Sequence, residues 1–403
     1  MNSKKIIIST LFFLFSLSII SSAQVQINGS LDLELSGGGE ESRFITNGIS
    51  KKFSELNLAV TQLNAFLFAP VSDNIFFESR IQLDTWGSGK LNPPRISLAT
   101  LTWDNPDNSY IVKVGRFISP FGFYTKRQLS TDRVFVQHPL GYSYFTNISD
   151  IRGYWPEAGN NTNEEYEEGD VGLSTLYFAG YVTGIGTQLE IKKNRLFLDA
   201  AITNGTPITI RNRSSLPNVA LTSRLFYRPS VFWEQGISMS FGNFMQGDPL
   251  NNSVRSQESF QKFYQLLFGG DTKIAFTYFE IISEVIYSNW KTPAFISNQF
   301  NTSCGGNLCE YNLSNLSGNI DFKFEPPSLT GSYIAFRAEH LLFLNANDPE
   351  SNSSFDWDQD VSRLSAVFGY KFAPNVLLKA SFSDQGDFDL SESAFRLQLS
   401  SFF

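Results

Sequence analysis

The feature that most constrains this chain is a period-two alternation of apolar and polar residues near its C-terminal end. In 361–372, one parity carries Leu364 and Phe368, whereas the other carries Arg363 and Lys371. The pattern recurs in four segments: 329–343, 361–372, 376–383 and 395–403. Side chains of a β-strand alternate between two faces, so the pattern predicts strands with one apolar and one polar surface.

A noisier form of this alternation extends over the rest of the chain. It predicts twelve further strands: 25–35, 53–68, 75–85, 95–103, 110–117, 172–191, 195–204, 219–228, 231–242, 265–276, 280–289 and 316–325. Short connections rich in Pro, Asn or Asp alternate with longer ones, of which 118–171 is the longest. We therefore expect an all-β, transmembrane, antiparallel up-and-down β-barrel of about sixteen strands, with a long third external loop.

Composition favours a membrane barrel over the alternative of a soluble secreted protein. Aromatic residues make up 15% of the chain, including 39 Phe, and charged residues only 17%. The mean hydropathy is nevertheless slightly negative, at -0.14. A barrel reconciles these values because its polar residues face the lumen and its apolar residues face lipid. We expect residues 24–403 to form such a barrel in contact with lipid of a Gram-negative outer membrane.

The two ends of the chain agree with export to that membrane. Lys4 and Lys5 precede an apolar and hydroxyl run over 6–20, which is followed by Ser21-Ser22-Ala23. This arrangement predicts a cleaved signal peptide over 1–23. The last strand is amphipathic and ends in Phe403, which is typical of the signal that the barrel-insertion machinery reads, so that machinery is an expected partner.

A barrel of about sixteen strands is wide enough to leave a lumen, which predicts passive diffusion of small solutes. Catalysis has little support, since the chain has two His and no nucleophile-elbow, phosphate-loop or two-histidine metal motif. We expect no enzyme activity, no cofactor and no metal site. The net charge of -8 argues against a nucleic-acid partner, which would need a basic face.

The longest loop is basic around its first half, in contrast to the acidic chain. Arginine and lysine side chains at a constriction would favour anions by Coulomb attraction. The candidate residues are Arg116, Lys126, Arg127, Arg133 and Arg152. In the alternative interpretation they have a structural role and pair with Asp132, Asp150 and the acidic run over 164–168.

The polar parity of the last strands supplies a second set of cations. Arg337, Arg363, Lys371, Lys379 and Arg396 would lie on adjacent strands and form a basic lumen wall toward the constriction. Alternatively, cross-strand acids such as Glu339 and Asp384 neutralise them. Earlier strands carry inward acids, namely Glu78, Asp84, Glu190 and Asp199, so a transverse field across the lumen is equally consistent with the sequence.

The only two cysteines lie close together in a predicted external loop. Cys304 and Cys309 bracket four residues, and an external loop lies beyond the reducing cytosol. This spacing predicts a disulfide that closes the loop. A metal site would need further ligands, and no His is near in sequence.

Three stretches resemble the phosphate-selective porin O and P family, particularly its Bacteroidetes-type members. Val114-Gly115-Arg116-Phe117 with Pro120-Phe121-Gly122 looks like the start of that family's third loop. The segment 268–273 with 284–287 is similar to its central hairpin, and 363–382 resembles its penultimate hairpin.

The resemblance implies a sixteen-stranded barrel, commonly a homotrimer, that conducts small anions or other solutes past an inward-folded third loop. Family members described as anion-selective line the pore with arginines and lysines, and this chain matches them only in general charge. The acidic run over 164–170 departs from the pattern. A second class of function stays open, in which the barrel is non-conducting and its external loops act in binding or adhesion.

Overall fold

The computed structural model describes residues 25–39, 42, 56–85, 92–105, 109–156, 172–176, 180–208, 219–245, 262–297, 299–305, 307–386 and 388–403. The predicted signal peptide over 1–23 lies outside the described residues. Helices in the described part of the chain are short, and none has the length and apolar character needed to cross a membrane.

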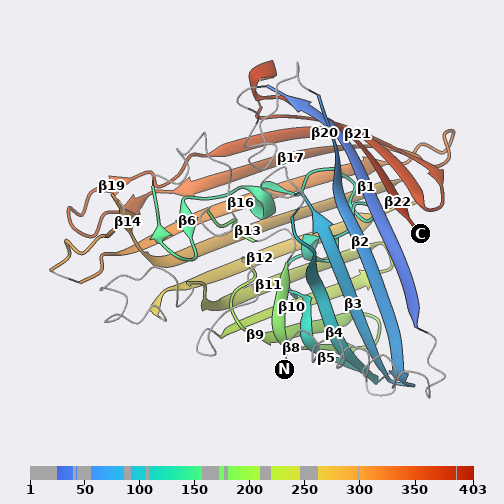
Figure 1. The fold of residues 1–403 in the computed structure, drawn as a ribbon, viewed down its shortest axis with the longest axis horizontal. Coiled ribbons are helices and arrows are strands. Elements are labelled where there is room, and N and C mark those ends of the chain that lie inside the picture. The colour runs from blue at the N-terminus through green and yellow to red at the C-terminus, as the bar shows by residue number, and fades with distance from the viewer. Residues whose placement is uncertain are drawn as a thin grey trace, which may run out of the picture.

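Sixteen strands form one closed antiparallel barrel, which confirms the predicted fold class and strand number (Figure 1). In order around the barrel they are β1 (Gln26–Gly38), β2 (Asn57–Ser72), β3 (Ile75–Asp84), β4 (Arg95–Asn105), β5 (Tyr110–Ile118), β8 (Tyr181–Lys192), β9 (Leu196–Thr203), β10 (Ala220–Ser230), β11 (Trp233–Asn243), β12 (Tyr264–Ala275), β13 (Phe279–Pro293), β16 (Glu310–Phe324), β17 (Ser332–Leu344), β20 (Val361–Ala373), β21 (Val376–Asp384) and β22 (Ala394–Phe402).

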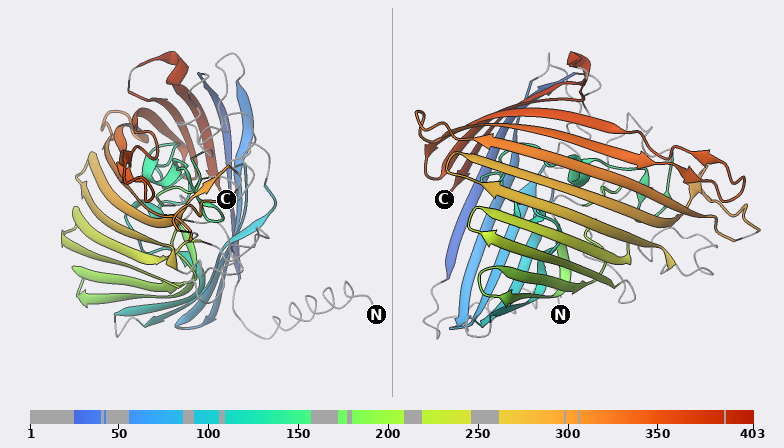
Figure 2. Two further views of the ribbon diagram at one scale, coloured as in Figure 1. Left: turned by 90° about the vertical axis from the view of Figure 1, so that its left-hand side faces the viewer. Right: turned by 180° about the vertical axis from the view of Figure 1, so that it is seen from behind.

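Short and long connections lie at opposite ends of the barrel, and β13, β16 and β17 project beyond their neighbours at the long-loop end (Figures 1 and 2). Two small hairpins extend this projection: β14 (Phe295–Ile296) with β15 (Gln299–Phe300), and β18 (Ala346–Asn347) with β19 (Ser354–Phe355). In the usual orientation of such barrels, the short-turn end is periplasmic and the long-loop end is external.

The burial pattern of the strands follows the predicted parities. On β17, Ile334 and Phe336 are 41% and 55% exposed on the outer surface, whereas Arg337 and Glu339 are buried inside. His340 lies on the exposed face, as its parity predicts, and contacts the Ser362 hydroxyl. The alternation therefore produces an apolar exterior and a polar interior.

Two predicted strand boundaries differ most from the structure. In the segment predicted as one strand over 172–191, the barrel strand begins only at Tyr181. Residues 172–176 instead form backbone hydrogen bonds with the preceding loop. Leu173 donates its backbone N–H to Ile148 O, and Leu176 donates to Gly141 O. The strand predicted over 316–325 starts earlier, at Glu310, where it pairs with Pro293 in the projecting part of the barrel.

The barrel closes where the two ends of the described chain meet. Gly29 and Phe403 exchange two backbone hydrogen bonds of 2.6 and 2.8 Å, next to the β1–β22 ladder. The Phe403 ring covers Gly29, because a Cβ built on Gly29 would lie 2.6 Å from the ring. An aromatic ring over a glycine shields backbone that has no side chain of its own. The terminal aromatic residue therefore packs against a matching notch in the first strand.

Replacing Gly29 with Val should displace the Phe403 ring and weaken closure, because the branched side chain needs the space that the ring occupies. We expect a loss of about 1–3 kcal/mol, the usual range for overpacking. A lower temperature for the heat-induced mobility shift of the folded barrel on a denaturing gel would report this loss. Gly270→Val is the matched control, because a Cβ at Gly270 has no atom within 4 Å. An equal decrease of this temperature in Gly29→Val and Gly270→Val would contradict the packing of Phe403 against Gly29.

Candidate functional site in the barrel lumen

The described part of the connection between β5 and β8 folds into the barrel, where it lies inside the ring of strands in the end-on view of Figure 2. Its described part contains four short elements: η3 (Tyr124–Lys126), α2 (Leu140–Ser143), β6 (Ile148–Ser149) and β7 (Gly153–Tyr154). We call residues 119–156 the inward loop. Its side chains and backbone bond to wall residues on strands from β1 to β21.

The start of the inward loop is held by a buried carboxylate on β13. Glu284 accepts hydrogen bonds from Phe123 N at 2.7 Å and from the Tyr142 hydroxyl at 2.7 Å. Gly122 N donates to the Ser238 hydroxyl at 2.9 Å. Gly122 has φ +66°, and a Cβ there would lie 2.2 Å from Glu284 Oε1. Only glycine therefore fits this backbone conformation and this close approach.

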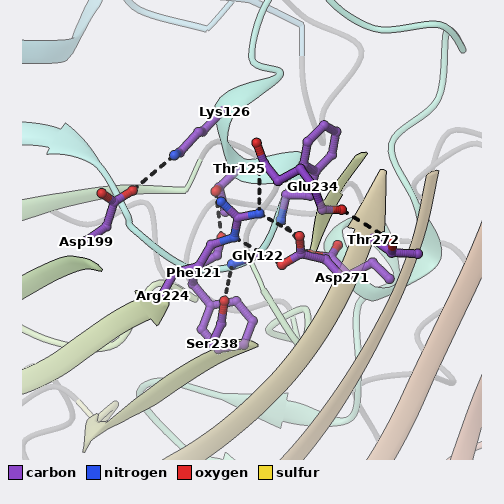
Figure 3. Close-up of polar contacts among 12 residues, drawn as sticks. Phe121, Gly122, Thr125, Lys126, Asp199, Arg224, Glu234, Ser238, Asp271 and Thr272 are labelled. Atoms are coloured by element: carbon purple, nitrogen blue, oxygen red, sulfur yellow. Dashed lines mark hydrogen bonds and ion pairs between the residues drawn. The ribbon is translucent and has the colours of Figure 1, made fainter. Parts of the chain in front are cut away.

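A charged cluster on β9 to β12 lies beside this anchor (Figure 3). Arg224 is buried and forms hydrogen bonds of 3.0 and 2.5 Å to the two oxygens of Asp271, and one of 2.9 Å to Glu234. Lys126 reaches from the inward loop to Asp199 at 3.0 Å. Arg224 was not identified as a candidate from the sequence, although it lies at an inward-facing position of β10. A buried bidentate pair of this kind orders the wall under the loop.

A second buried ion pair joins β16 and β17. Arg337 donates to both oxygens of Asp321, at 2.6 and 2.7 Å, and to Gln137 O in the loop at 3.1 Å. The Tyr124 hydroxyl bonds to the same Asp321. The Arg337 guanidinium also lies 4.2 Å from the centre of the Phe135 ring. This pair therefore holds two separate parts of the inward loop.

Most of the other predicted wall cations also have partners. Arg363 pairs with Glu339 at 2.5 Å, as the neutralising alternative predicted, and Glu339 accepts from Leu140 N at 2.9 Å. Lys379 is fully buried and donates to Ser130 O in the inward loop, whereas Arg396 lies 3.7 Å from Glu34. Lys371 is exposed at the short-turn end.

Asp384, the other acid expected to neutralise the wall, has a different role. It accepts hydrogen bonds from the backbone of Gly386 and Phe388 and from the Ser393 hydroxyl. These contacts order the turn between β21 and β22. Asp384 lies at the external end of β21, where hydrogen-bond donors of the following turn reach it. It therefore binds the turn and does not neutralise a wall cation.

The structure places the five predicted constriction cations in different surroundings. Lys126 pairs with Asp199, and Arg127 pairs with Glu280 at 3.2 Å, so their acidic partners come from the wall instead of from the loop. Arg116 donates to Ser97 O at 3.1 Å. Arg152 lies over the Trp155 ring at 4.2 Å. The acidic run over 164–168, predicted as another partner, lies outside the described residues.

Arg133, the fifth of these cations, lies against an uncharged histidine. Burial, reinforced by the charges of Arg133, Arg337, Arg363 and Lys379, holds the pKa of His138 well below its ordinary value. A neutral imidazole can accept a hydrogen bond from the Arg133 guanidinium, which it contacts. Within the described chain, Arg133 has no carboxylate within ion-pair distance, and its Nε has no hydrogen-bond partner.

A buried apolar cluster fills the external side of the barrel between β12 and β20. Phe343 packs edge-on against Trp357 at 4.8 Å, and Trp357 packs against Trp290 at 5.9 Å. The cluster also contains Leu140 and Tyr144 of the inward loop. External loops and inward loop therefore share one core on this side.

The two cysteines lie at the edge of this core. Cys304 and Cys309 form a disulfide with a Cα–Cα distance of 5.3 Å. Cys309 is itself buried in the apolar cluster, and Cys304 packs against it. The bridge therefore closes its loop next to the core.

One carboxyl group ties the external loop over 345–360 to the inward loop. Asp358 accepts hydrogen bonds from the Tyr144 hydroxyl at 3.0 Å and from Asn147 N at 2.8 Å. Burial raises the pKa of Asp358 to about 6, against the partial compensation of these hydrogen bonds. Ionisation of this buried carboxyl group therefore costs desolvation free energy that the hydrogen bonds offset only in part.

A cavity of about 530 Å³ opens at the short-turn end, between the inward loop and the wall. We call it the vestibule. Its charged residues are Arg127, Arg133, Lys323, Lys371, Asp132, Glu280 and Glu325. Glu280 is paired with Arg127, and Glu325 with Lys323. Arg133 and Lys371 thus face a single unpaired acid, Asp132, among the described residues.

The fold resembles those of several solved outer-membrane proteins. An anion-selective porin from Comamonas acidovorans superposes with a TM-score of 0.56 at 9% identity, over 95% of this chain and 100% of that one. The outer-membrane channel DcaP of Acinetobacter baumannii gives 0.55 at 12% identity, over 94% and 97%. The in-vitro folded trimer form of OmpT, an outer-membrane protein of Vibrio cholerae, gives 0.53 at 10%, over 95% and 100%.

No family model matches the sequence, and no curated protein matches it. At these low identities, the likeness to solved structures establishes the fold of the chain.

Replacing Arg337 with Met should destabilise the folded barrel strongly, because Asp321 then stays buried without its counter-charge. We expect a loss of about 3–5 kcal/mol, as for other broken buried pairs. Arg337→Met combined with Asp321→Asn should recover part of that loss. Denaturant unfolding in detergent micelles, followed by tryptophan fluorescence, measures both variants. A double variant no more stable than Arg337→Met would contradict the pair as the source of the effect.

The folded loop that contains Asp358 should be more stable in acid. Because the folded-state pKa of about 6 exceeds the usual aspartate pKa of about 3.9, stabilisation is complete below about pH 4 and is lost as pH rises through about 6. Protease cleavage within 345–360 should therefore be slower at pH 4.5 than at pH 7. Asp358→Asn should remove this difference. A pH dependence that persists in Asp358→Asn would assign it to another group.

Proposed function

We propose that the chain is an integral outer-membrane porin that allows passive diffusion of small hydrophilic solutes. The observation that carries this proposal is a closed sixteen-stranded barrel with an apolar exterior, a polar interior and one long loop bound inside. The fold likeness to outer-membrane channels, including one described as an anion-selective porin, supports it. Barrels of this size have an interior wider than their own wall side chains can fill.

We further propose a weak preference for anions that is set at the vestibule. Four of the five predicted wall cations, Arg337, Arg363, Lys379 and Arg396, contact wall acids or loop carbonyl oxygens, so their charges are largely matched. Arg133 and Lys371 remain in excess over Asp132 in the vestibule. Excess positive charge in a narrow passage raises the local anion concentration. A weak preference for anions then does not require a continuous basic wall along the lumen.

The finer resemblance to the phosphate-selective porin family belongs to this proposal, as does a homotrimeric assembly. One solved structure of similar fold is described as a trimer. The signal peptide over 1–23 and recognition of the strand ending in Phe403 by the insertion machinery complete the proposed route to the membrane.

A specific observation favours a second candidate, a non-conducting barrel whose loops bind a partner. The apolar cluster around Trp290, Phe343 and Trp357 closes the external side between β12 and β20. If the remaining passage is also closed, the barrel presents its external loops without conducting.

Reversal potentials in a planar bilayer under a potassium chloride gradient test the proposal. The protein over 24–403 should give stable open steps with a modest excess of chloride over potassium permeability. Lys371→Glu should remove or invert that excess, because it exchanges an unpaired vestibule cation for an anion. Lys193→Glu is the control for net charge, since Lys193 is exposed in the β8–β9 turn.

Each outcome of this measurement decides one part of the proposal. Folded protein that never conducts would overturn the porin and favour the binding barrel. Open steps whose selectivity is the same in wild type, Lys371→Glu and Lys193→Glu would keep the porin and reject the vestibule as its selectivity site.

A further inference from the structure

Four phenylalanines line one inner wall of the barrel near its short-turn end. Phe66 and Phe68 share the inward face of β2 with Asn64, which is buried and donates to Ser30. The other two are Phe76 on β3 and Phe402 on β22. Phe402 pairs in register with Ser30.

These rings form two neighbouring pairs that are partly exposed. The Phe66 and Phe402 centroids are 5.8 Å apart, and those of Phe68 and Phe76 are 5.5 Å apart. None of the four belongs to the buried apolar clusters of the described chain. A barrel lumen is normally lined by polar side chains, and exposed aromatic surface is unfavourable in water. Their exposure marks a surface suited to contact with a solute.

A carboxylate lies within this aromatic surface. Glu78 is directly opposite Phe68 in the β2–β3 register and shares the inward face of β3 with Phe76. In the described part of the chain, the Glu78 side chain has no ion pair or hydrogen bond. The buried carboxylates Asp271, Asp321 and Glu339, by contrast, are each paired with an arginine.

The next residue along this face of β3 is a cation, Arg80, which does not neutralise Glu78. Arg80 pairs in register with Phe66, but its guanidinium donates to the Ser97 hydroxyl at 2.8 Å and to Gln82 at 3.0 Å. It also lies over the Tyr181 ring at 4.9 Å, toward the inward loop. The charge of Glu78 is therefore left available to the lumen.

From this arrangement we infer that Phe66, Phe68, Phe76, Phe402 and Glu78 form a contact site for small organic cations. Ring faces attract a cation through their quadrupole, and methylated ammonium groups suit such surfaces because they are bulky and weakly hydrated. The unpaired carboxylate supplies the complementary charge and disfavours anions. The site lies on a different wall from the vestibule, so it acts on a different class of solute.

This inference rests on the proposed function, because it requires an open lumen. The experiment records potassium chloride current through single channels while choline is added to the bath. Choline should cause brief, concentration-dependent blocks. Its uncharged carbon isostere, 3,3-dimethylbutan-1-ol, should not cause them.

Glu78→Gln removes the charge of the site, and Phe68→Leu removes one of its aromatic rings. Each substitution should shorten the blocks by about tenfold, because each of these contacts with the cation contributes roughly a factor of ten to its affinity. Glu190→Gln is the matched control, because it removes a carboxylate from the same end of the barrel at the β8–β9 turn, and it should leave the blocks unchanged. The open-channel current of each variant shows that it is folded.

The outcomes separate the two proposals. Open channels without choline blocks, or blocks of equal length in Glu78→Gln and wild type, would overturn the organic-cation site and leave the porin intact. Blocks shortened equally by Glu78→Gln and Glu190→Gln would also overturn it, since net charge would then be the cause. Folded protein without any open steps would reject the porin itself.

Discussion

Closure of the sheet is the constraint on which the rest of the structure depends. In lipid, an unpaired backbone N–H or C=O group has no water to bond, so a sheet can cross only as a ring without edges. Here the ring closes through the β1–β22 ladder and the two hydrogen bonds between Gly29 and Phe403. Every other feature, including the two-faced strands and the enclosed loop, presupposes that closure.

Closure creates an interior that must be filled or left open, and this chain does both. Buried charges on the wall are matched by opposite charges or by carbonyl oxygens of the inward loop, because an unmatched buried charge is costly. Asp321 with Arg337, and Glu339 with Arg363, each serve wall and loop together. Few cations without a matching charge therefore remain to make the lumen selective for anions. What remains unmatched, namely Arg133 and Lys371 in the vestibule and Glu78 on the wall formed by β1 to β3 and β22, is where a solute would be recognised.

Much of the fold could be predicted because period-two alternation reports the environment of each residue directly. The parities of Ile334, Arg337 and His340 followed from sequence alone, as did the sixteen strands. The contacts of Lys126 and Arg127 did not, because their partners Asp199 and Glu280 lie on strands far along the chain. Arg224, Glu284 and the four inner phenylalanines were missed for the same reason. No local pattern distinguishes an inward Phe that meets a solute from one that meets the loop.

The sequence by itself therefore determined the class of the fold, the number of strands and the face on which each side chain lies, since these depend on local alternation and turn chemistry. Only the tertiary structure decided where the longest loop goes and which charges cancel. Those outcomes depend on which residues closure brings across the lumen, and electrostatic interaction falls with distance in space, regardless of separation along the chain.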